Sequence, residues 1–195
     1  MIARRSTGST LIELMIGLAV LALLLMTAAP NYGVWLANTR IRNASESIQN
    51  GLRLARNEAV QRDVNVRFEL TSATNASWQI CALAAATDTC STSTSTQIQQ
   101  FNAAAGASSV VIGSEKDTSY ATGKFNTALT SLASSGVTFN ASGRPTDYGG
   151  TSIVRIDASS TTGGTRRLVT TLTVSGSIRM CDPQLSMTTS PQGCS

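Results

Sequence analysis

The stretch Ser9-Thr-Leu-Ile-Glu-Leu-Met-Ile-Gly-Leu-Ala-Val-Leu-Ala-Leu-Leu-Leu-Met-Thr-Ala-Ala29 decides the fold of this chain. Its 19 residues from Leu11 to Ala29 carry a single charge, on Glu13. At about 1.5 Å per residue, a helix of this length nearly crosses a hydrocarbon core of about 30 Å. An ionised side chain at membrane depth costs on the order of 3 kcal/mol. We therefore expect Glu13 to lie near the cytoplasmic end of a membrane span and to find a partner once the helix leaves lipid.

The residues on either side of this run sharpen the prediction. Residues 1–8 form a short positive leader, and Pro30 follows the run directly. Together with Gly8, Ser9 and Glu13, this pattern resembles the start of a type IV prepilin. The resemblance implies that a prepilin peptidase cuts after Gly8, that the new N-terminal residue Ser9 is methylated, and that Glu13 and Pro30 serve filament assembly. Ser9 departs from the family pattern, in which phenylalanine is usual at this place.

Two other interpretations of the same run remain open. An ordinary secretory signal would be cleaved near residues 27–29, and a plain membrane anchor would never be processed. The apolar run is longer than the usual core of a secretory signal, and an internal glutamate is unusual there. The arginines before the run favour a cytoplasmic N-terminus, which predicts a single-pass inner-membrane protein with a periplasmic C-terminal domain. The mass of the mature N-terminus decides among the three interpretations.

Residues 31–62 predict an amphipathic continuation of the helix. Apolar residues recur here at spacings of three and four, which draws one stripe along a helix. This stripe consists of Ile41, Ala44, Ile48, Leu52, Ala55 and Ala59. Charged side chains occupy the other side, where Glu58 and Arg62 form a favourable pair four residues apart. We expect the helix to end near Arg62, and we expect Pro30 to bend or loosen it, because proline lacks the backbone donor.

Beyond residue 62 the apolar period changes from 3.6 to 2, which indicates strands. The expected strands are residues 64–70, 78–82, 110–112, 137–139, 153–156, 167–174 and 178–181, with a hairpin around residues 163–164. Residues 84–109 are rich in Ala, Ser, Thr and Gln, and we expect a loop there that sets partner choice. One long helix followed by strands predicts an α+β, type IV pilin-like fold, in which the helix packs on an antiparallel β-sheet domain. The predicted divisions are the leader 1–8, the hydrophobic transmembrane or filament-core helix 9–30, the amphipathic stalk 31–62 and the β-rich domain 63–195.

Charge and cysteine content agree with this division. The net charge of +4 belongs to the leader and the stalk, because from residue 63 onward eight basic residues face eight acidic ones. Four cysteines fit an oxidising compartment and allow three pairings. We prefer the local pairs Cys81–Cys90 and Cys181–Cys194, because each closes a short loop that contains turn-forming residues. Zinc binding is the rival interpretation, but the chain has no CxxC spacing and no histidine, which argues against a metal site.

Two further stretches resemble the GspH/FimT family of minor pilins and pseudopilins. The helical part is residues 35–41 with 49–59, and the strand part is residues 137–144 with 175–181. The resemblance implies a minor subunit that helps to start or cap a type IV pilus, or else the minor pseudopilin H of a type II secretion system. Its implied partners are other pilins or pseudopilins, the prepilin peptidase, the inner-membrane assembly platform and membrane lipid.

Some FimT-like proteins bind DNA through a late Gly-Arg-x-Arg motif, which makes DNA a third partner to consider. Here the aligned residues are Gly176-Ser177-Ile178-Arg179, so only the second arginine is present. Phosphate binding scales with the number of cationic contacts, so the loss of one arginine should weaken it. Arg144, Arg166 and Arg167 are the other candidate DNA-binding residues. A set of scattered arginines is also typical of a solvated hairpin.

The sequence predicts neither an enzyme nor a cofactor site. It has no histidine, no G-x-S-x-G motif and no phosphate-binding loop. Glu115 and Asp117 flank Lys116 in a polar loop, and the pair Asp147 and Asp157 gives no better case for acid–base catalysis. We expect a structural, filament-forming protein.

Overall fold

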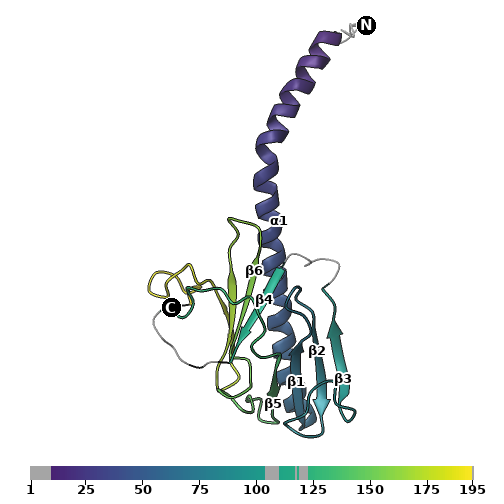
Figure 1. Ribbon diagram of the computed structural model, residues 1–195, viewed down its shortest axis with the longest axis vertical. Coiled ribbons are helices and arrows are strands. Elements are labelled where there is room, and N and C mark those ends of the chain that lie inside the picture. The colour runs from purple at the N-terminus through teal and green to yellow at the C-terminus, as the bar shows by residue number, and fades with distance from the viewer. Residues whose placement is uncertain (1–9, 104–109, 117, 119–122, 195) are drawn as a thin grey trace, which may run out of the picture.

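A computed structural model describes residues 10–103, 110–116, 118 and 123–194, and describes residues 27–31 of the helix by their backbone alone. One long helix, α1 (Leu11–Arg62), precedes every strand of the described part. These strands are β1 Asn65–Leu70, β2 Trp78–Leu83, β3 Thr96–Phe101, β4 Val110–Glu115, β5 Gly136–Phe139, β6 Arg155–Ser160, β7 Leu168–Leu172 and β8 Ile178–Cys181. Figure 1 shows α1 as a curved rod whose N-terminal half projects well beyond the domain that the strands form. The α+β prediction is confirmed.

Helix α1 runs without interruption through residue 30 and ends where the sequence predicts. The end is set by Asp63, whose φ of 54° and ψ of 38° place it in the left-handed region. A residue in that conformation terminates a helix, and aspartate tolerates it better than most side chains. The expected pair forms across the last turn, with Arg62 Nε 2.6 Å from Glu58 Oε2. The side chain of Pro30 lies outside the described residues, so the predicted effect of that proline stays a prediction.

The strands form two antiparallel sheets, whereas the sequence predicted one. The first sheet has the order β3-β2-β1-β5 and the second has the order β4-β6-β7-β8. The segment before β6 connects them, because Ile153 N donates to Gly136 O of β5 and Val154 N donates to Glu115 O of β4. An alternating pattern tells which side chains of a strand are buried, but it does not tell which strands are neighbours. The sequence pattern therefore could not predict the division into two sheets.

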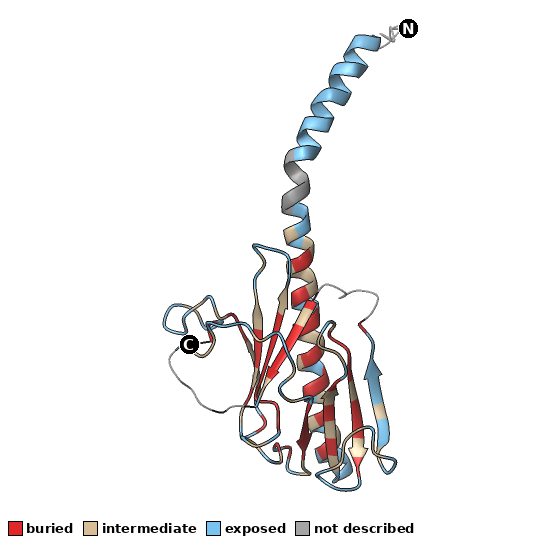
Figure 2. Cartoon of the chain, viewed as in Figure 1, coloured by how far each residue is buried: buried red, intermediate tan, exposed pale blue. Residues whose placement is uncertain are grey.

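The predicted stripe of α1 lies at the centre of the core. Each of its six residues is at most 3% exposed, and they pack in one cluster with residues of both sheets. Gly51 lies between stripe residues at the tightest point, where an added Cβ would come within 2.8 Å of Phe68 and 2.9 Å of Trp78. The indole of Trp78 packs there and donates from Nε1 to Ser47 Oγ at 3.0 Å. Figure 2 shows the consequence, since the half of α1 beside the sheets carries many buried residues, whereas residues 11–26 of the projecting half are all exposed.

Two strand predictions need correction. Residues 84–109 were expected to be a loop, but β3 occupies Thr96–Phe101 within them. Its sequence TQIQQF has no alternation, because only Ile98 packs against the core and the strand lies at the edge of its sheet. The strand expected at residues 153–156 instead begins at Arg155. Ile153 and Val154 are buried, which is why their pattern resembled a strand, but they belong to the connection between the two sheets and lie outside β6.

Both disulfides have the predicted local pairing. Cys81 and Cys90 lie 5.5 Å apart at their Cα atoms and close the β2–β3 hairpin. Cys181 and Cys194 lie 5.1 Å apart and hold the C-terminal loop against the end of β8. The hairpin expected around residues 163–164 is also confirmed, because β6 and β7 pair antiparallel on either side of it.

Candidate assembly surface

The N-terminal half of α1 presents apolar side chains on all sides and the rest of the chain leaves them uncovered. Every described side chain from Leu11 to Met26 is exposed. Large apolar side chains with exposed fractions between 50% and 79% are Leu11, Ile12, Leu14, Met15, Ile16, Leu18, Val20, Leu21, Leu23, Leu24, Leu25 and Met26. A helix that is apolar all round is normally buried in protein or lipid. A contiguous apolar surface of this extent therefore marks an interaction site.

Glu13 is the one described carboxylate on this surface. It lies in the first turn of α1 and is exposed. A carboxylate near a helix N-terminus is favoured by the helix dipole. No described residue of the chain forms an ion pair with Glu13. The predicted cleavage and methylation residues Gly8 and Ser9 lie outside the described part of the chain, so their roles stay predictions.

Aromatic side chains follow where α1 approaches the domain. Tyr32 and Trp35 are 63% and 60% exposed, and their ring centroids lie 5.8 Å apart. Trp35 borders a hollow of about 400 Å³ between α1 and the strands β7 and β8. Met180, Arg166 and Asp182 contribute to the lining of the same hollow. Tyr32 and Trp35 thus add an exposed aromatic pair where α1 approaches the domain.

Three of the four candidate DNA-binding arginines are engaged within the chain. Arg166 pairs with the buried Asp182 at 2.7 Å, and its backbone N–H donates to Asn38 Oδ1 of α1 at 2.8 Å. Arg179 donates from Nη2 to Pro191 O at 2.9 Å and to Gly193 O at 2.8 Å, which fixes the C-terminal loop. These contacts give both arginines a structural role.

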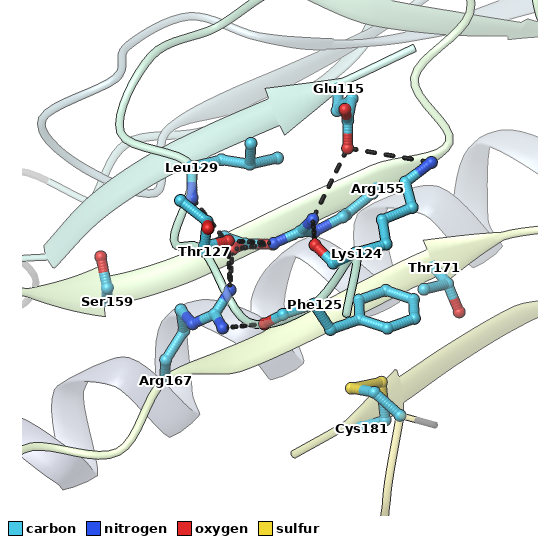
Figure 3. Close-up of polar contacts among 12 residues, drawn as sticks. Glu115, Lys124, Phe125, Thr127, Leu129, Arg155, Ser159, Arg167, Thr171 and Cys181 are labelled. Carbon is cyan, nitrogen blue, oxygen red and sulfur yellow. Dashed lines mark hydrogen bonds and ion pairs between the residues drawn. A yellow bond between two sulfur atoms is a disulfide. The ribbon is translucent and has the colours of Figure 1, made fainter. Parts of the chain in front are cut away.

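Arg167 belongs to a buried ion cluster that the sequence did not reveal (Figure 3). The centre of the cluster is Asp157, which is fully buried. Arg155 donates to its two oxygens from Nε and Nη2, each at 2.7 Å, and Arg167 donates to Asp157 as well. Arg155 also donates to Thr127 O at 2.7 Å. Burial of a carboxylate costs little only when the group is paired and hydrogen-bonded, as Asp157 is here.

The same cluster secures the long connection between β4 and β5. Arg155 Nη1 donates to Lys124 O at 2.7 Å, and its guanidinium lies 5.2 Å from the ring centroid of Phe125. Arg167 Nη2 donates to Phe125 O and Asp157 Oδ2 accepts from Leu129 N at 3.1 Å. These hydrogen bonds tie the loop to the buried guanidinium groups of Arg155 and Arg167. These contacts give the cluster a structural role.

Unlike the other three candidate arginines, Arg144 forms no side-chain hydrogen bond or ion pair with a described residue. It is exposed, on the turn after β5, and its backbone N–H donates to Asn140 Oδ1 at 3.0 Å. The glycine of the aligned motif, Gly176, has a structural explanation, because its φ is +77° and an added Cβ would meet Gly143 O at 2.2 Å. The turn between β7 and β8 requires glycine at this position whether or not the protein binds DNA.

The sequence of the chain matches the profile of a known family over most of its length. The profile described as type II transport protein GspH matches residues 44–190. The chain belongs to the GspH family. The prokaryotic N-terminal methylation motif matches residues 3–29 as well, which covers the predicted cleavage site and most of the apolar run. The fold is accordingly type IV pilin-like, and the chain is a member of a family of minor pilins and pseudopilins.

Two solved structures are similar to this chain at low sequence identity. The type IV minor pilin FimU of Pseudomonas aeruginosa PAO1 is 16% identical, with a TM-score of 0.49 over 80% of this chain and 96% of FimU. The minor pseudopilin EpsH of the Vibrio cholerae type 2 secretion system is 12% identical, with a TM-score of 0.48 over 75% of this chain and 99% of EpsH. No curated protein sequence matches the chain significantly. Among the residues that the structure describes, none forms a helix both long enough and apolar enough to span a membrane.

The sequence analysis did not predict two features of the structure, the hollow beside Trp35 and the ion cluster around Asp157. The hollow beside Trp35 brings together residues far apart in the chain, and no local pattern predicts it. The ion cluster around Asp157 had a weak signal, because Arg155 and Asp157 alternate with apolar residues in a strand that is otherwise buried. Two opposite charges two residues apart lie on the same face of a strand, so this spacing could have suggested an ion pair between Arg155 and Asp157.

Proposed function

We propose that this GspH-family protein is a minor subunit of a type IV pilus that assembles through the exposed half of α1 and helps to initiate or cap the filament. The observation that carries the proposal is the division of α1 into two apolar regions. The stripe from Ile41 to Ala59 is buried by the protein's own sheets, whereas residues 11–26 are left exposed. A surface of that kind needs a cover from outside the chain, first lipid and then neighbouring subunits.

The proposed sequence of events follows from the chemistry of the N-terminus. A prepilin peptidase removes residues 1–8, and Ser9 becomes a methylated N-terminal residue. The subunit waits in the inner membrane with its globular domain in the periplasm. The assembly platform then extracts it into a filament, where residues 11–29 pack against the helices of other pilins. Glu13 pairs there with the positive amine at Ser9 of an adjacent subunit, which offsets a desolvation cost of several kcal/mol.

The direct test is replacement of Glu13 in the full chain. We expect Glu13→Gln and Glu13→Leu to leave the folding of the domain unchanged, since the residue lies far from the core, and to lower incorporation into filaments by about tenfold. Incorporation is measured as the ratio of filament-bound to membrane-bound subunit. If both variants assemble like the wild type, the charge pairing is not part of the mechanism. A mature N-terminus that starts at residue 30, or still begins with Met1, would contradict the processing step.

A pseudopilus is the alternative filament for the same surface. The matched family carries the description of a type II transport protein, which favours a role as the minor pseudopilin H of a type II secretion system. Deletion of the gene followed by parallel assays of twitching, DNA uptake and exoprotein release distinguishes the two. Loss of twitching alone supports the pilus, and loss of exoprotein release alone supports the pseudopilus.

DNA binding during natural transformation is a weaker alternative. It would rest on Arg144, Arg166, Arg167 and Arg179, of which three already serve contacts within the chain. We expect the affinity for DNA to be low, and to fall with rising salt if phosphate contacts contribute. The variant Arg144→Ala tests the candidate arginine whose side chain has no hydrogen bond or ion pair with a described residue, so we expect the fold to stay intact. An unmeasurable affinity at low salt would end this proposal.

A further inference from the structure

The aromatic pair Tyr32 and Trp35 lies just beyond the apolar run of α1. The run ends at Ala29, so the two residues follow it by three and six positions. At about 1.5 Å per residue, their Cα atoms lie about 4.5 and 9 Å past that end. The polar headgroup layer on each side of a bilayer is about 5–7 Å thick. Because helical side chains lean toward the N-terminus, both rings lie at headgroup depth when the run occupies the hydrocarbon core.

Both rings have the character of side chains found at that depth. Tyrosine and tryptophan are enriched at membrane–water interfaces, since each combines an apolar ring with a polar tip. More than half of each side chain is exposed, whereas the other tryptophan, Trp78, is 4% exposed in the core. The described part of the chain therefore leaves the aromatic pair available to contact headgroups.

The hollow beside Trp35 lies on the same side of α1 as this pair. Its lining from the helix includes Trp35, Asn38, Thr39 and Arg42, whose spacing of three and four puts them on one face. Tyr32 precedes Trp35 by three residues, so it extends that face toward the projecting rod. Residues of β7 and β8 form the opposite wall. The aromatic pair and the hollow thus form one continuous surface.

Two arginines line the hollow, one on each wall. Arg42 belongs to α1, Arg166 precedes β7, and Asp182 is the one carboxylate among the described lining residues. Arg42 Nε lies 2.9 Å from Glu46 Oε1, and Arg166 Nη2 lies 2.7 Å from Asp182 Oδ2. A guanidinium has several N–H donors on three nitrogens, so each arginine keeps donors for a further anion. Their side chains are also well exposed, at 71% and 59%.

The turn between β6 and β7 holds Arg166 against α1. The backbone N–H of Arg166 donates to Asn38 Oδ1 at 2.8 Å. This contact leaves the Nδ2 group of Asn38 as a further donor in the lining. Figure 1 shows this turn at the end of the domain from which α1 projects. The cationic hollow therefore lies at the part of the domain closest to the rod.

The chemistry of this surface favours a phospholipid over a second copy of the rod. Residues 11–29 of another copy carry no anion except Glu13, so they would leave the two arginines without a partner. A phospholipid has a phosphate next to acyl chains, which matches arginines next to the apolar side chains of Trp35, Leu168 and Met180. An excess of arginine over carboxylate in the lining favours an anionic headgroup.

From these observations we propose that the hollow beside Trp35 binds the headgroup of an anionic phospholipid in the leaflet that faces the domain. The phosphate lies between Arg42 and Arg166, and an acyl chain follows Trp35 and Tyr32 toward the rod. The inference rests on the membrane stage of the proposed function. It names the contact that seats the domain on the bilayer before assembly.

The first test measures the depth of Trp35, with the full chain reconstituted into vesicles of phosphatidylcholine and phosphatidylglycerol. A nitroxide on the lipid headgroup, or at the end of the acyl chain, quenches the fluorescence of nearby tryptophan. The signal of Trp35 is the difference from the Trp35→Phe variant, which keeps only the buried Trp78. We expect the headgroup nitroxide to quench Trp35 about threefold more strongly than the acyl-chain nitroxide. Equal quenching from both depths, or none, would overturn the proposal.

The second test measures the selectivity for anionic lipid. The probe is nitroxide-labelled phosphatidylglycerol, diluted into unlabelled phosphatidylcholine, and the readout is again the quenching of Trp35. We expect Arg42→Gln to lower the apparent affinity for the probe by about fivefold. Its exposed pair with Glu46 contributes little to stability, so the fold should stay intact. Arg53→Gln is the matched control, because Arg53 is exposed on α1 and does not line the hollow. Equal losses in both variants would contradict the role of the hollow.

A further pair of variants tests the hollow by filling it. Gln192 is exposed and lines the hollow, whereas Gln184 is exposed in the same C-terminal loop and does not line it. We expect Gln192→Phe to weaken quenching by the labelled phosphatidylglycerol and Gln184→Phe to leave it unchanged. Glycerol phosphate in solution, at the concentration of the total lipid, should not compete. Competition by glycerol phosphate would show a site for soluble anions and would overturn the lipid proposal.

Incorporation of the same variants into filaments separates this proposal from the proposed function. If the chain enters filaments and Trp35 shows no preference for phosphatidylglycerol, the lipid site is wrong and assembly through α1 stands. If the preference is present, depends on Arg42, and the chain is absent from filaments, the lipid site stands and the proposed filament role is wrong.

Discussion

The two halves of α1 use apolar residues in opposite ways. From Ile41 to Ala59 the apolar side chains form one stripe, and the two sheets cover it completely. From Leu11 to Met26 they surround the helix, and the described part of the chain covers none of them. A helix with one apolar stripe packs that stripe on its own domain. A helix that is apolar all round is normally buried in protein or lipid. The comparison teaches that one continuous helix serves two separate interfaces.

The largest effect should come from a charge placed on each half. We expect Ile48→Asp to prevent stable folding of the domain, because it removes a buried side chain and buries a carboxylate, at a combined cost of more than about 4 kcal/mol. Leu21→Asp on the exposed half should leave the unfolding midpoint of the domain unchanged and reduce membrane association. Denaturant unfolding followed by circular dichroism, together with membrane fractionation, measures both effects. A domain that unfolds equally in the two variants would break the comparison.

A smaller effect should follow from removal of the C-terminal disulfide, which belongs to the covered region. The double variant Cys181→Ser, Cys194→Ser opens a loop with a sequence separation of 13 residues. We expect it to lower the free energy of unfolding by about 2–4 kcal/mol, mainly because the unfolded chain gains freedom. Insertion of α1 into membranes should remain as in the wild type. Reduced insertion would mean that the two regions are coupled, contrary to the account.

The smallest effect should come from a pair of glycines, one in each half of α1. Gly51→Ala should destabilise the domain by about 1–3 kcal/mol, because the added methyl group presses on Phe68 and Trp78. Gly17 has no atom within 4 Å of an added Cβ, so Gly17→Ala should not destabilise the domain and should favour the helix by about 1 kcal/mol. Thermal unfolding of both variants provides the measurement. Similar melting temperatures for the two would show that Gly51 is not tightly packed.

The sequence predicted those parts of the fold that follow from local periodicity. The end of α1 and the burial of its stripe could be predicted, because a period of 3.6 tells which side of a helix is covered. Strand β3 could not be predicted from the sequence, because an edge strand with polar side chains on both faces lacks the alternation that marks a strand.

Long-range pairings account for the rest of what could not be predicted. The assignment of eight strands to two sheets depends on contacts such as Ile153 with Gly136, which no local pattern encodes. The candidate DNA-binding residues show the same limit. Arg167 and Arg179 looked alike as exposed cations, but their partners, Asp157 and the C-terminal carbonyls, are brought to them by the fold. The exposed apolar surface of residues 11–26 could be predicted, because it depends on one uninterrupted apolar run.

The central claim is that residues 11–26 serve assembly alone and contribute nothing to the folding of the domain. Its most direct test is deletion of residues 1–29, with the remaining chain exported to the periplasm by an ordinary cleavable signal. The account predicts that the truncated chain unfolds at the same denaturant concentration as the full chain and is absent from both membranes and filaments. A truncated chain that still enters filaments, or that unfolds at a markedly lower denaturant concentration, would contradict it.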